Sequence, residues 1–248
     1  MKIYKQLLDI VQRRGAAFFV LLDPDKLHRS KVRDLVNKSE KAGADGFLIG
    51  SSLLLSTRFE DVVKETKETT KLPVVIFPGN ANQISKYADA ILFLSLISGR
   101  NPHLLIGEQV KSAPMIKEYD LEAIPTGYII VESGRPTSVQ FMSDTQPIPN
   151  DKPDIVKAHA LAAQYLGMRF VFLEAGSGAK NPVPDLIVRE VRKYIDIPVI
   201  VGGGIKTPQQ ARSKVKNGAS VVIIGNVLEK GYSEKTLSQF ALAIHYGG

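Results

Sequence analysis

The chain has 248 residues, of which 44% are hydrophobic and 23% are charged. These fractions are ordinary for a globular protein with a substantial core, and they exclude a disordered or membrane-embedded chain. The formal net charge is +7, but the lysines and arginines are scattered among acidic residues. This pattern favours a solvated surface and an anionic small-molecule ligand over a nucleic-acid partner.

The sequence contains no cysteine, which excludes disulfides and thiolate chemistry. Its first residues lack the basic-then-apolar pattern of a secretory signal, and no apolar run approaches the roughly 20 residues that cross a bilayer. We therefore expect a cytoplasmic protein whose contact with a membrane is at most peripheral.

Short apolar runs alternate with helical patterns along the chain. Residues 17–22 are continuously apolar and end at a polar Asp-Pro-Asp turn, which is typical of a buried strand. The same reasoning predicts strands at residues 46–50, 73–77, 90–94, 128–131, 170–173, 199–201 and 221–224. Helices are predicted at residues 30–41, 153–166, 184–194 and 207–216, the last with Thr207 as N-cap and Pro208 at the first helical position.

This alternation predicts an α/β fold. Strands separated by helices pair in parallel through right-handed crossovers. About eight such units, with strands apolar on both faces, favour a closed (β/α)₈ TIM barrel over an open sheet, whose edge strands would carry more polar residues. No linker divides residues 1–248, so we expect a single domain, with residues 3–14 as an additional helix across the barrel floor.

Residues 95–114 depart from this repeat, because they mix apolar and turn residues where a plain barrel helix is expected. They form either a loop followed by an ordinary amphipathic helix or an apolar wall. Such a wall would suit a long hydrocarbon ligand or a subunit contact.

Three glycine-centred segments, residues 173–178, 201–205 and 224–226, each follow an apolar run and precede a helical pattern. Glycine lets backbone N–H groups approach an anion, and the start of a helix adds unpaired N–H groups. Because the carboxyl ends of parallel strands share one face, these loops together predict a phosphate site.

The reacting residues of such barrels lie at the carboxyl ends of the strands. Asp23 and Ser52 would offer hard oxygen ligands that suit Mg²⁺, although Asp23 equally fits an Asx turn. Glu174 leads into the first glycine loop, where it is either a base and hydroxyl ligand or a cap for the loop's own N–H groups. Further polar residues at strand ends are Tyr128 and Glu132.

Six motifs together resemble the geranylgeranylglyceryl phosphate synthase family, also called the PcrB-like prenyltransferases. They are FFVLLDPDK (18–26), GADGFLIGSS (43–52), YIIVE (128–132), FLEAGSGA (172–179), VGGGIK (201–206) and GNVLEK (225–230). The stretch SGRNP (98–102) is similar to that of the archaeal and Bacteroidetes-type branch of the family.

The resemblance implies an enzyme that joins the C3 hydroxyl of sn-glycerol 1-phosphate to geranylgeranyl diphosphate and releases diphosphate with Mg²⁺ present. It implies Asp23 and Ser52 as magnesium ligands, and Glu174 as the residue that contacts the glycerol hydroxyls and accepts the proton. The implied glycerol phosphate site consists of Phe172, Leu173, Glu174, Ala175, Gly176, Ser177, Gly178, Gly203, Gly204, Gly225 and Asn226. Tyr128 and Glu132 are expected as second contacts, and a homo-oligomer, either a dimer or a hexamer, is implied, with residues 104–106 as a candidate contact.

The chain departs from the family pattern at two places. Many members carry a lysine two residues before the first-strand aspartate, where this chain has Leu21, so Lys26 or the glycine loops would take over its contact with the phosphate. Relatives often read Glu-Pro-Gly-Gly after the fifth strand, where this chain has Glu-Ser-Gly-Arg at residues 132–135.

Two other functions stay open from the residues themselves. An isomerase acting on a phosphosugar would share the glycine loops and could use Asp23 and Glu174 as an acid and base pair. A barrel that only binds a phosphorylated or prenylated ligand would not need Asp23, Ser52 and Glu174 together.

Overall fold

The structure is a computed structural model that describes residues 2–225 and 233–245. Its strands are β1 (Ala17–Leu22), β2 (Gly46–Ile49), β3 (Val74–Ile76), β4 (Ala90–Leu96), β5 (Glu122–Ile130), β6 (Phe170–Glu174), β7 (Val199–Gly202) and β8 (Val221–Ile224). The α-helices in the described residues are α1 (Lys2–Arg14), α2 (Val32–Lys41), α3 (Phe59–Thr69), α4 (Glu108–Glu118), α5 (Ser138–Ser143), α6 (Pro153–Tyr165), α7 (Asp185–Tyr194), α8 (Pro208–Lys216) and α9 (Glu234–His245). A 3₁₀ turn, η1 (Arg29–Lys31), precedes α2, and a π-helical turn, η2 (His103–Gly107), precedes α4.

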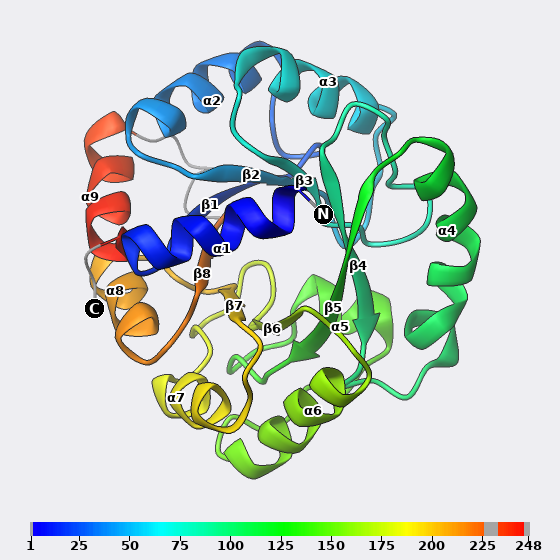
Figure 1. The fold of residues 1–248 in the computed structure, drawn as a ribbon, viewed down its shortest axis with the longest axis vertical. Coiled ribbons are helices and arrows are strands. Elements are labelled where there is room, and N and C mark those ends of the chain that lie inside the picture. The colour runs from blue at the N-terminus through cyan, green and yellow to red at the C-terminus, as the bar shows by residue number, and fades with distance from the viewer. Residues whose placement is uncertain (1, 226–232, 246–248) are drawn as a thin grey trace.

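The strands β1 to β8 close into one parallel barrel in sequence order, and the helices surround it (Figure 1). This confirms the α/β TIM barrel predicted from the sequence. The predicted strands agree closely with the structure except at β5, which begins at Glu122 and not at residue 128. The first part of β5 was not recognised in the sequence because it contains Pro125 and Gly127, and proline and glycine interrupt a strand pattern. In the structure the carbonyl of Pro125 accepts a hydrogen bond from Arg169 N at 2.8 Å.

Alternation along the strands divides the core into two layers. In β1, Phe19 joins the cluster inside the barrel, whereas Phe18 and Val20 join the cluster between the barrel and its helices. Successive side chains of a strand point to opposite faces. At the carboxyl ends of the strands, the residues whose side chains face the inside of the barrel therefore point toward its mouth.

Helix α1 crosses the opposite end of the barrel (Figure 1). Its side chains Tyr4, Leu7 and Ile10 are buried in the interior cluster. The Glu122 carboxylate accepts hydrogen bonds from the backbone N–H groups of Ile3 and Tyr4 at 2.7 and 3.0 Å, which satisfies two donors that a helix start leaves unpaired. The expected helix across the barrel floor is therefore present.

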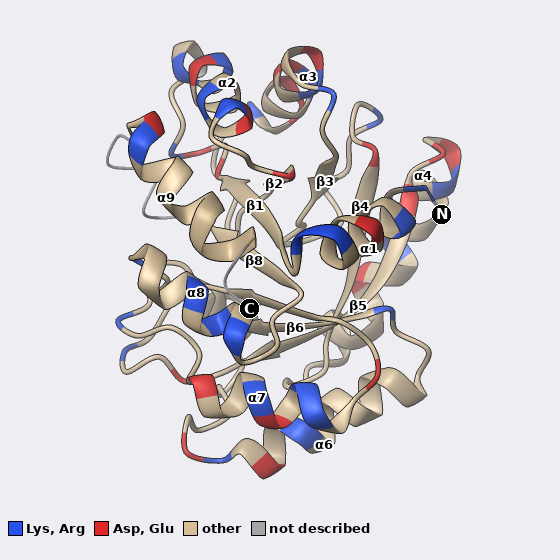
Figure 2. Ribbon diagram, turned by 60° about the vertical axis from the view of Figure 1, so that its left-hand side comes forward, with Lys and Arg blue, Asp and Glu red and all other residues tan. Residues whose placement is uncertain are grey.

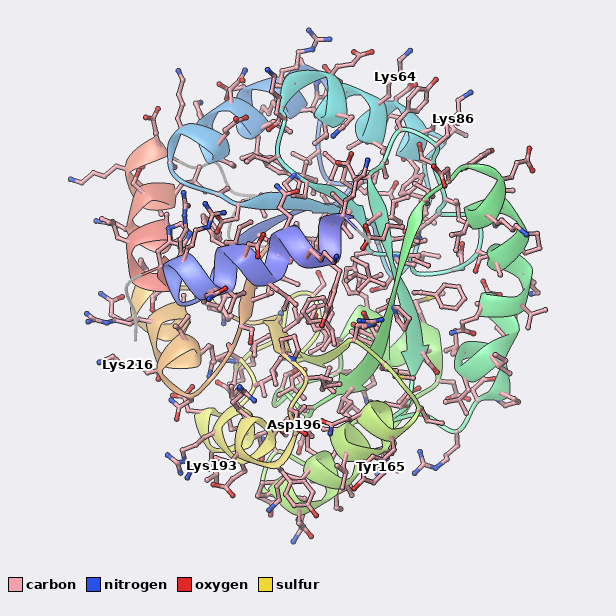
Figure 3. All side chains as sticks on the ribbon, in the orientation of Figure 1. Lys64, Lys86, Tyr165, Lys193, Asp196 and Lys216 are labelled. Atoms are coloured by element: carbon pink, nitrogen blue, oxygen red, sulfur yellow. The ribbon has the colours of Figure 1, made fainter. Side chains whose placement is uncertain are left out.

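Charged residues of both signs are distributed over the outer helices, with α8 carrying basic residues only (Figure 2). At the periphery Lys64 and Lys86 lie over the ring of Tyr87, with ammonium-to-centroid distances of 5.4 and 5.5 Å (Figure 3). In the described residues, every helix is too short or too polar to cross a bilayer.

Candidate active site

A cavity of about 760 Å³, here called the larger cavity, opens at the carboxyl ends of the strands. Segments at the ends of seven strands contribute to its lining. They are Asp23 after β1, Ser51 and Ser52 after β2, Phe77 after β3, Arg135 after β5, Glu174, Ser177 and Gly178 from β6 onward, Gly203 and Gly204 after β7, and Gly225 after β8. The three glycine segments predicted to share one face thus line one cavity. Asn226 lies outside the described residues.

Glu174 ends β6 with its side chain 6% exposed. Burial raises the pKa of its carboxyl group to about 7, and a hydrogen bond of 2.6 Å from Gly176 N to Glu174 Oε1 opposes that rise. The residue therefore caps the loop, which is one of the two interpretations of its position, and its side chain also lines the cavity. A carboxyl group with a pKa near 7 can accept a proton at neutral pH.

The glycine loop after β7 differs from the expectation in one respect, because N–H groups at the start of the helix that follows it are already hydrogen-bonded. Gly203 and Gly204 have φ values of +78° and +69°, which favours glycine. Three N–H groups just before and within the first turn of α8, which follows them, are bonded by side chains of the same segment. Gln210 Oε1 accepts from Lys206 N and Thr207 N, and Thr207 Oγ1 accepts from Gln210 N. An anion beside these glycines would therefore rely on the loop more than on the helix start.

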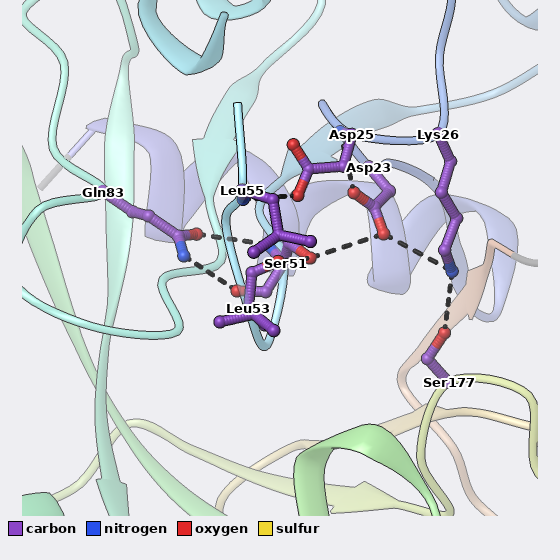
Figure 4. A network of polar contacts seen from close by, with 8 residues as sticks. All are labelled: Asp23, Asp25, Lys26, Ser51, Leu53, Leu55, Gln83 and Ser177. Atoms are coloured by element: carbon purple, nitrogen blue, oxygen red, sulfur yellow. Dashed lines mark hydrogen bonds and ion pairs between the residues drawn. The ribbon is translucent and has the colours of Figure 1, made fainter. Parts of the chain in front are cut away.

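Asp23 belongs to a polar network at the edge of the larger cavity (Figure 4). Its Oδ1 accepts a hydrogen bond from Asp25 N at 3.1 Å, which is the Asx turn that the sequence allowed. Its Oδ2 lies 3.4 Å from Ser51 Oγ and 3.4 Å from Lys26 Nζ. Ser52 also lines the cavity but makes no hydrogen bond to Asp23 in the described part of the chain.

The donor set at this network is compatible with Mg²⁺, because it consists of carboxylate and hydroxyl oxygens. It is also sparse. No group of three or more His, Cys, Asp or Glu residues within residues 2–225 and 233–245 is arranged to hold a metal. A magnesium ion beside Asp23 would therefore need most of its ligands from water and from substrate oxygens.

A second cavity of about 250 Å³, here called the smaller cavity, lies between β3, β4 and α4. Its lining is mainly apolar and includes Ile91, Leu92, Leu94, Leu96 and Leu104. Residues 95–114 form a turn, η2 and the first part of α4, which is close to the interpretation as a loop followed by a helix. They contribute both apolar and polar side chains to this cavity: Leu96, His103, Leu104, Glu108, Gln109 and Ser112. The two cavities share Ser51, Ser52, Phe77, Tyr128 and Val139 in their linings.

Tyr128 lies where the two cavities meet, with 6% of its surface exposed. Its ring packs edge-on against Phe77 and Phe172, with centroid distances of 5.7 and 5.2 Å. Burial raises the pKa of the phenol well above its ordinary value, and the nearby Glu174 charge adds to the rise. Tyr128 therefore stays neutral and can donate a hydrogen bond at the junction.

Several predicted site residues do not reach either cavity with their side chains. Glu132 is exposed and is absent from both linings. Leu173 and Ala175 have the opposite parity to Glu174 and are buried against the helices. Phe172 is fully buried inside the barrel, where it supports Tyr128. A contact from Leu173 or Ala175 to a ligand would have to come from the backbone.

The structure adds residues that the sequence patterns did not single out. Arg135 donates a hydrogen bond to the carbonyl of Gly178 and lines the larger cavity. Gln83 is fully buried and clamps the backbone of Ser51, with Nε2 to Ser51 O at 2.8 Å and Ser51 N to Oε1 at 3.1 Å. Arginine before a turn and glutamine in a loop are common, so only the folded contacts reveal them.

Comparisons with known proteins agree with this geometry. Residues 8–244 match the model of the PcrB family. A geranylgeranylglyceryl phosphate synthase of Chitinophaga pinensis is 42% identical over 98% of this chain and 96% of its own length. One of Thermococcus kodakarensis is 47% identical over 89% of this chain and 87% of its own length. A crystal structure of (S)-3-O-geranylgeranylglyceryl phosphate synthase from Thermoplasma acidophilum, in complex with sn-glycerol-1-phosphate, superposes with a TM-score of 0.91 at 33% identity, covering 97% of this chain and 98% of that one.

Proposed function

The chain belongs to the PcrB family, and from this premise we propose that it transfers a geranylgeranyl group from geranylgeranyl diphosphate to the C3 hydroxyl of sn-glycerol 1-phosphate. The products are an ether lipid precursor and diphosphate. The observation that carries the proposal is the pair of joined cavities, one lined by glycine loops and charged side chains, the other by mainly apolar side chains.

The glycerol phosphate belongs in the larger cavity. Its phosphate faces the loops at Ser177–Gly178, Gly203–Gly204 and Gly225, where glycine leaves the backbone open to an anion. Lys26 and Arg135 bring positive charge to the same loop, because Lys26 Nζ lies 3.2 Å from Ser177 Oγ and Arg135 bonds to Gly178. The comparison structure with sn-glycerol-1-phosphate supports this choice of acceptor.

The prenyl chain belongs in the smaller cavity. Burial of each methylene contributes about 0.8 kcal/mol, so an apolar channel can hold a hydrocarbon tail without specific polar contacts. Tyr128 and Phe77 line both cavities, so the allylic carbon would lie near them while the diphosphate extends toward Asp23. This places the two reacting groups on either side of the junction.

We assign to Glu174 the role of accepting the proton of the C3 hydroxyl. Its Oε1 is held by Gly176 N, which leaves Oε2 to take the proton of the C3 hydroxyl as the C–O bond forms. The pKa of about 7 suits this task, because the carboxylate is populated at neutral pH and still basic enough to accept. Tyr128, which stays neutral, can donate a hydrogen bond beside it.

Mg²⁺ is the cofactor that we propose, with Asp23 and a hydroxyl of the Ser51-Ser52 pair as its protein ligands. The ion would balance the charge on the departing diphosphate. The residues themselves position the acceptor and exclude water around it, which is a large part of what a transfer of this kind requires. We further propose that the enzyme acts in the cytoplasm as a homo-oligomer.

The test is to incubate the purified protein with sn-glycerol 1-phosphate or its mirror image, sn-glycerol 3-phosphate, and a series of prenyl diphosphates from 10 to 20 carbons. Mass spectrometry of the products should reveal an ether with the 1-phosphate and little or none with the 3-phosphate. A protein that isomerises a phosphosugar and leaves every prenyl diphosphate intact would instead establish the isomerase alternative.

A further inference from the structure

Lys26 spans the mouth of the barrel between two strands that are not neighbours. It follows β1, whereas Ser177 follows β6, and β7 and β8 lie between them in the barrel. Its Nζ atom is 3.4 Å from Asp23 Oδ2 and 3.2 Å from Ser177 Oγ (Figure 4). One ammonium group therefore contacts the carboxylate proposed for the metal and the loop proposed for the phosphate.

The backbone that carries Lys26 is held firmly. Asp23 O accepts hydrogen bonds from Lys26 N and Leu27 N, at 3.2 and 3.1 Å. Arg58 donates to Leu27 O at 2.7 Å and to Pro24 O at 2.8 Å, which ties the turn to the segment before α3. With the turn fixed, the position of Nζ depends on the rotation of its own side chain, which is 39% exposed.

We propose that Lys26 couples the two ends of the larger cavity, so that neutralising Asp23 raises the affinity of the other end for glycerol phosphate. While Asp23 carries its charge, the carboxylate attracts the ammonium group and weakens its interaction with an anion at Ser177. When a divalent cation neutralises the Asp23 carboxylate, the cation repels the ammonium group, which then interacts more strongly with the phosphate. The coupling must be reciprocal, so bound glycerol phosphate equally favours the cation at Asp23.

This inference rests on the proposed function and specifies how the charge at Asp23 changes the affinity of the site for glycerol phosphate. Glycerol phosphate would bind weakly to the metal-free enzyme and tightly once the Asp23 side is occupied. Couplings of this kind typically change affinity 5- to 150-fold. Since Lys26 is partly exposed and screened by salt, we expect a value near the lower end, about tenfold.

A metal-free thermodynamic cycle tests the coupling without any measurement of turnover. Asp23→Asn removes the carboxylate charge as a cation would neutralise it, and Lys26→Met removes the ammonium group while keeping a long side chain. The dissociation constant of sn-glycerol 1-phosphate is measured by calorimetry at fixed ionic strength in the parent protein, both single variants and the double variant. The gain in affinity caused by Asp23→Asn should be about tenfold larger when Lys26 is present than when it is methionine.

Three further measurements sharpen the test. Lys26→Arg should retain the coupling, because it keeps the charge. Lys193→Met removes an equal charge from the outer surface of α7 (Figure 3) and should behave like the parent protein. Adding Mg²⁺ to the parent protein should tighten glycerol phosphate binding more than it does in Lys26→Met.

The proposal is overturned if Asp23→Asn changes affinity equally in both backgrounds, within about twofold. An equal loss of affinity in Lys26→Met with and without Mg²⁺ would also overturn it, since Lys26 would then be an ordinary anion contact. A folded parent protein that binds no sn-glycerol 1-phosphate under any condition would reject the proposed function itself. Thermal melting of each variant by circular dichroism verifies that the proteins compared are folded.

Discussion

Because Gly203 has no side chain, there is room beside it for the carboxylate of Glu174. A Cβ atom at position 203 would overlap Glu174 Oε1 and would also crowd the backbone nitrogen of Gly176. The same Oε1 accepts the hydrogen bond from Gly176 N. The loop after β7 therefore fixes where the acidic group at the end of β6 can lie.

Gly203→Ala should displace Glu174 and reduce turnover by at least tenfold. It also places alanine at a φ of +78°, which adds strain of about 1 kcal/mol or more. Gly167→Ala is the matched control, because Gly167 has a φ of +80° but no atom within 4 Å of the added Cβ. Urea unfolding and steady-state kinetics on both variants separate the strain, which they share, from the overlap, which only position 203 has. Equal activity in the two variants would refute the role assigned to this contact.

Glu174→Gln should lower turnover about 10² to 10⁴-fold, the usual range for the loss of a general base. Glutamine keeps the size of the side chain and can still accept the hydrogen bond from Gly176 N through its carbonyl oxygen. Affinity for sn-glycerol 1-phosphate should therefore change only a few-fold. Calorimetry and rapid-quench kinetics measure the two quantities separately. Unaltered turnover would remove Glu174 from the mechanism.

The raised pKa of Glu174 predicts a pH dependence of activity. With a pKa of about 7, the carboxylate form grows as the pH rises through neutrality, so kcat/KM should increase with a midpoint near pH 7. The measurement is kcat/KM between pH 5.5 and 8.5 in overlapping buffers. A profile that is flat across this range would show that Glu174 does not titrate in the free enzyme as burial predicts.

The same raised pKa predicts a pH dependence of stability. The pKa rises from 4.5 to about 7 on burial, so the folded state binds the extra proton in this window, and the free energy of unfolding should fall as the pH rises from 4.5 to 7. The full difference corresponds to about 3 kcal/mol. Glu174→Gln should lack this slope, so urea titrations of the two proteins at pH 5 and pH 8 should diverge. Parallel pH profiles would contradict the assigned shift.

Filling the smaller cavity should shorten the preferred prenyl chain. Ser112 lines that cavity from α4 and is 8% exposed, so Ser112→Phe would occupy space that a long tail needs. We expect kcat/KM to fall more for 20-carbon than for 10-carbon diphosphates, since each buried methylene contributes about 0.8 kcal/mol. Val110→Phe, at a position 65% exposed on the same helix, is the control and should keep the parent preference. A uniform loss over all chain lengths would place the tail elsewhere.

Much of this architecture could be predicted because it depends on local patterns. Continuous apolar runs located the strands of the barrel, and the glycine loops at residues 173–178 and 201–205 were expected on the face where they lie. The family resemblance is confirmed by the match over residues 8–244. The beginning of β5 was missed because Pro125 and Gly127 break the pattern that strands normally follow.

The contacts across the mouth of the barrel could not be predicted in the same way. Sequence spacing does not reveal that Lys26 reaches Ser177, 151 positions away, or that Arg135 bonds to Gly178. It also did not reveal that Glu132 is exposed whereas Glu174 is buried, because both lie at the end of a predicted strand. Burial and side-chain direction depend on the closure of the whole barrel, and these decide which acidic residue acquires a shifted pKa.

Helix α1 closes the floor of the barrel with Tyr4, Leu7 and Ile10, and the larger cavity opens at the opposite end, where the carboxyl ends of the strands lie. A lipid product made in this cavity would leave through that opening, past the loops proposed to bind its phosphate. When this product leaves, its long hydrocarbon chain is exposed to water unless a membrane or a detergent micelle accepts it. We therefore expect product release to limit turnover where no apolar acceptor is present, so that detergent or vesicles raise kcat without changing the rate of bond formation.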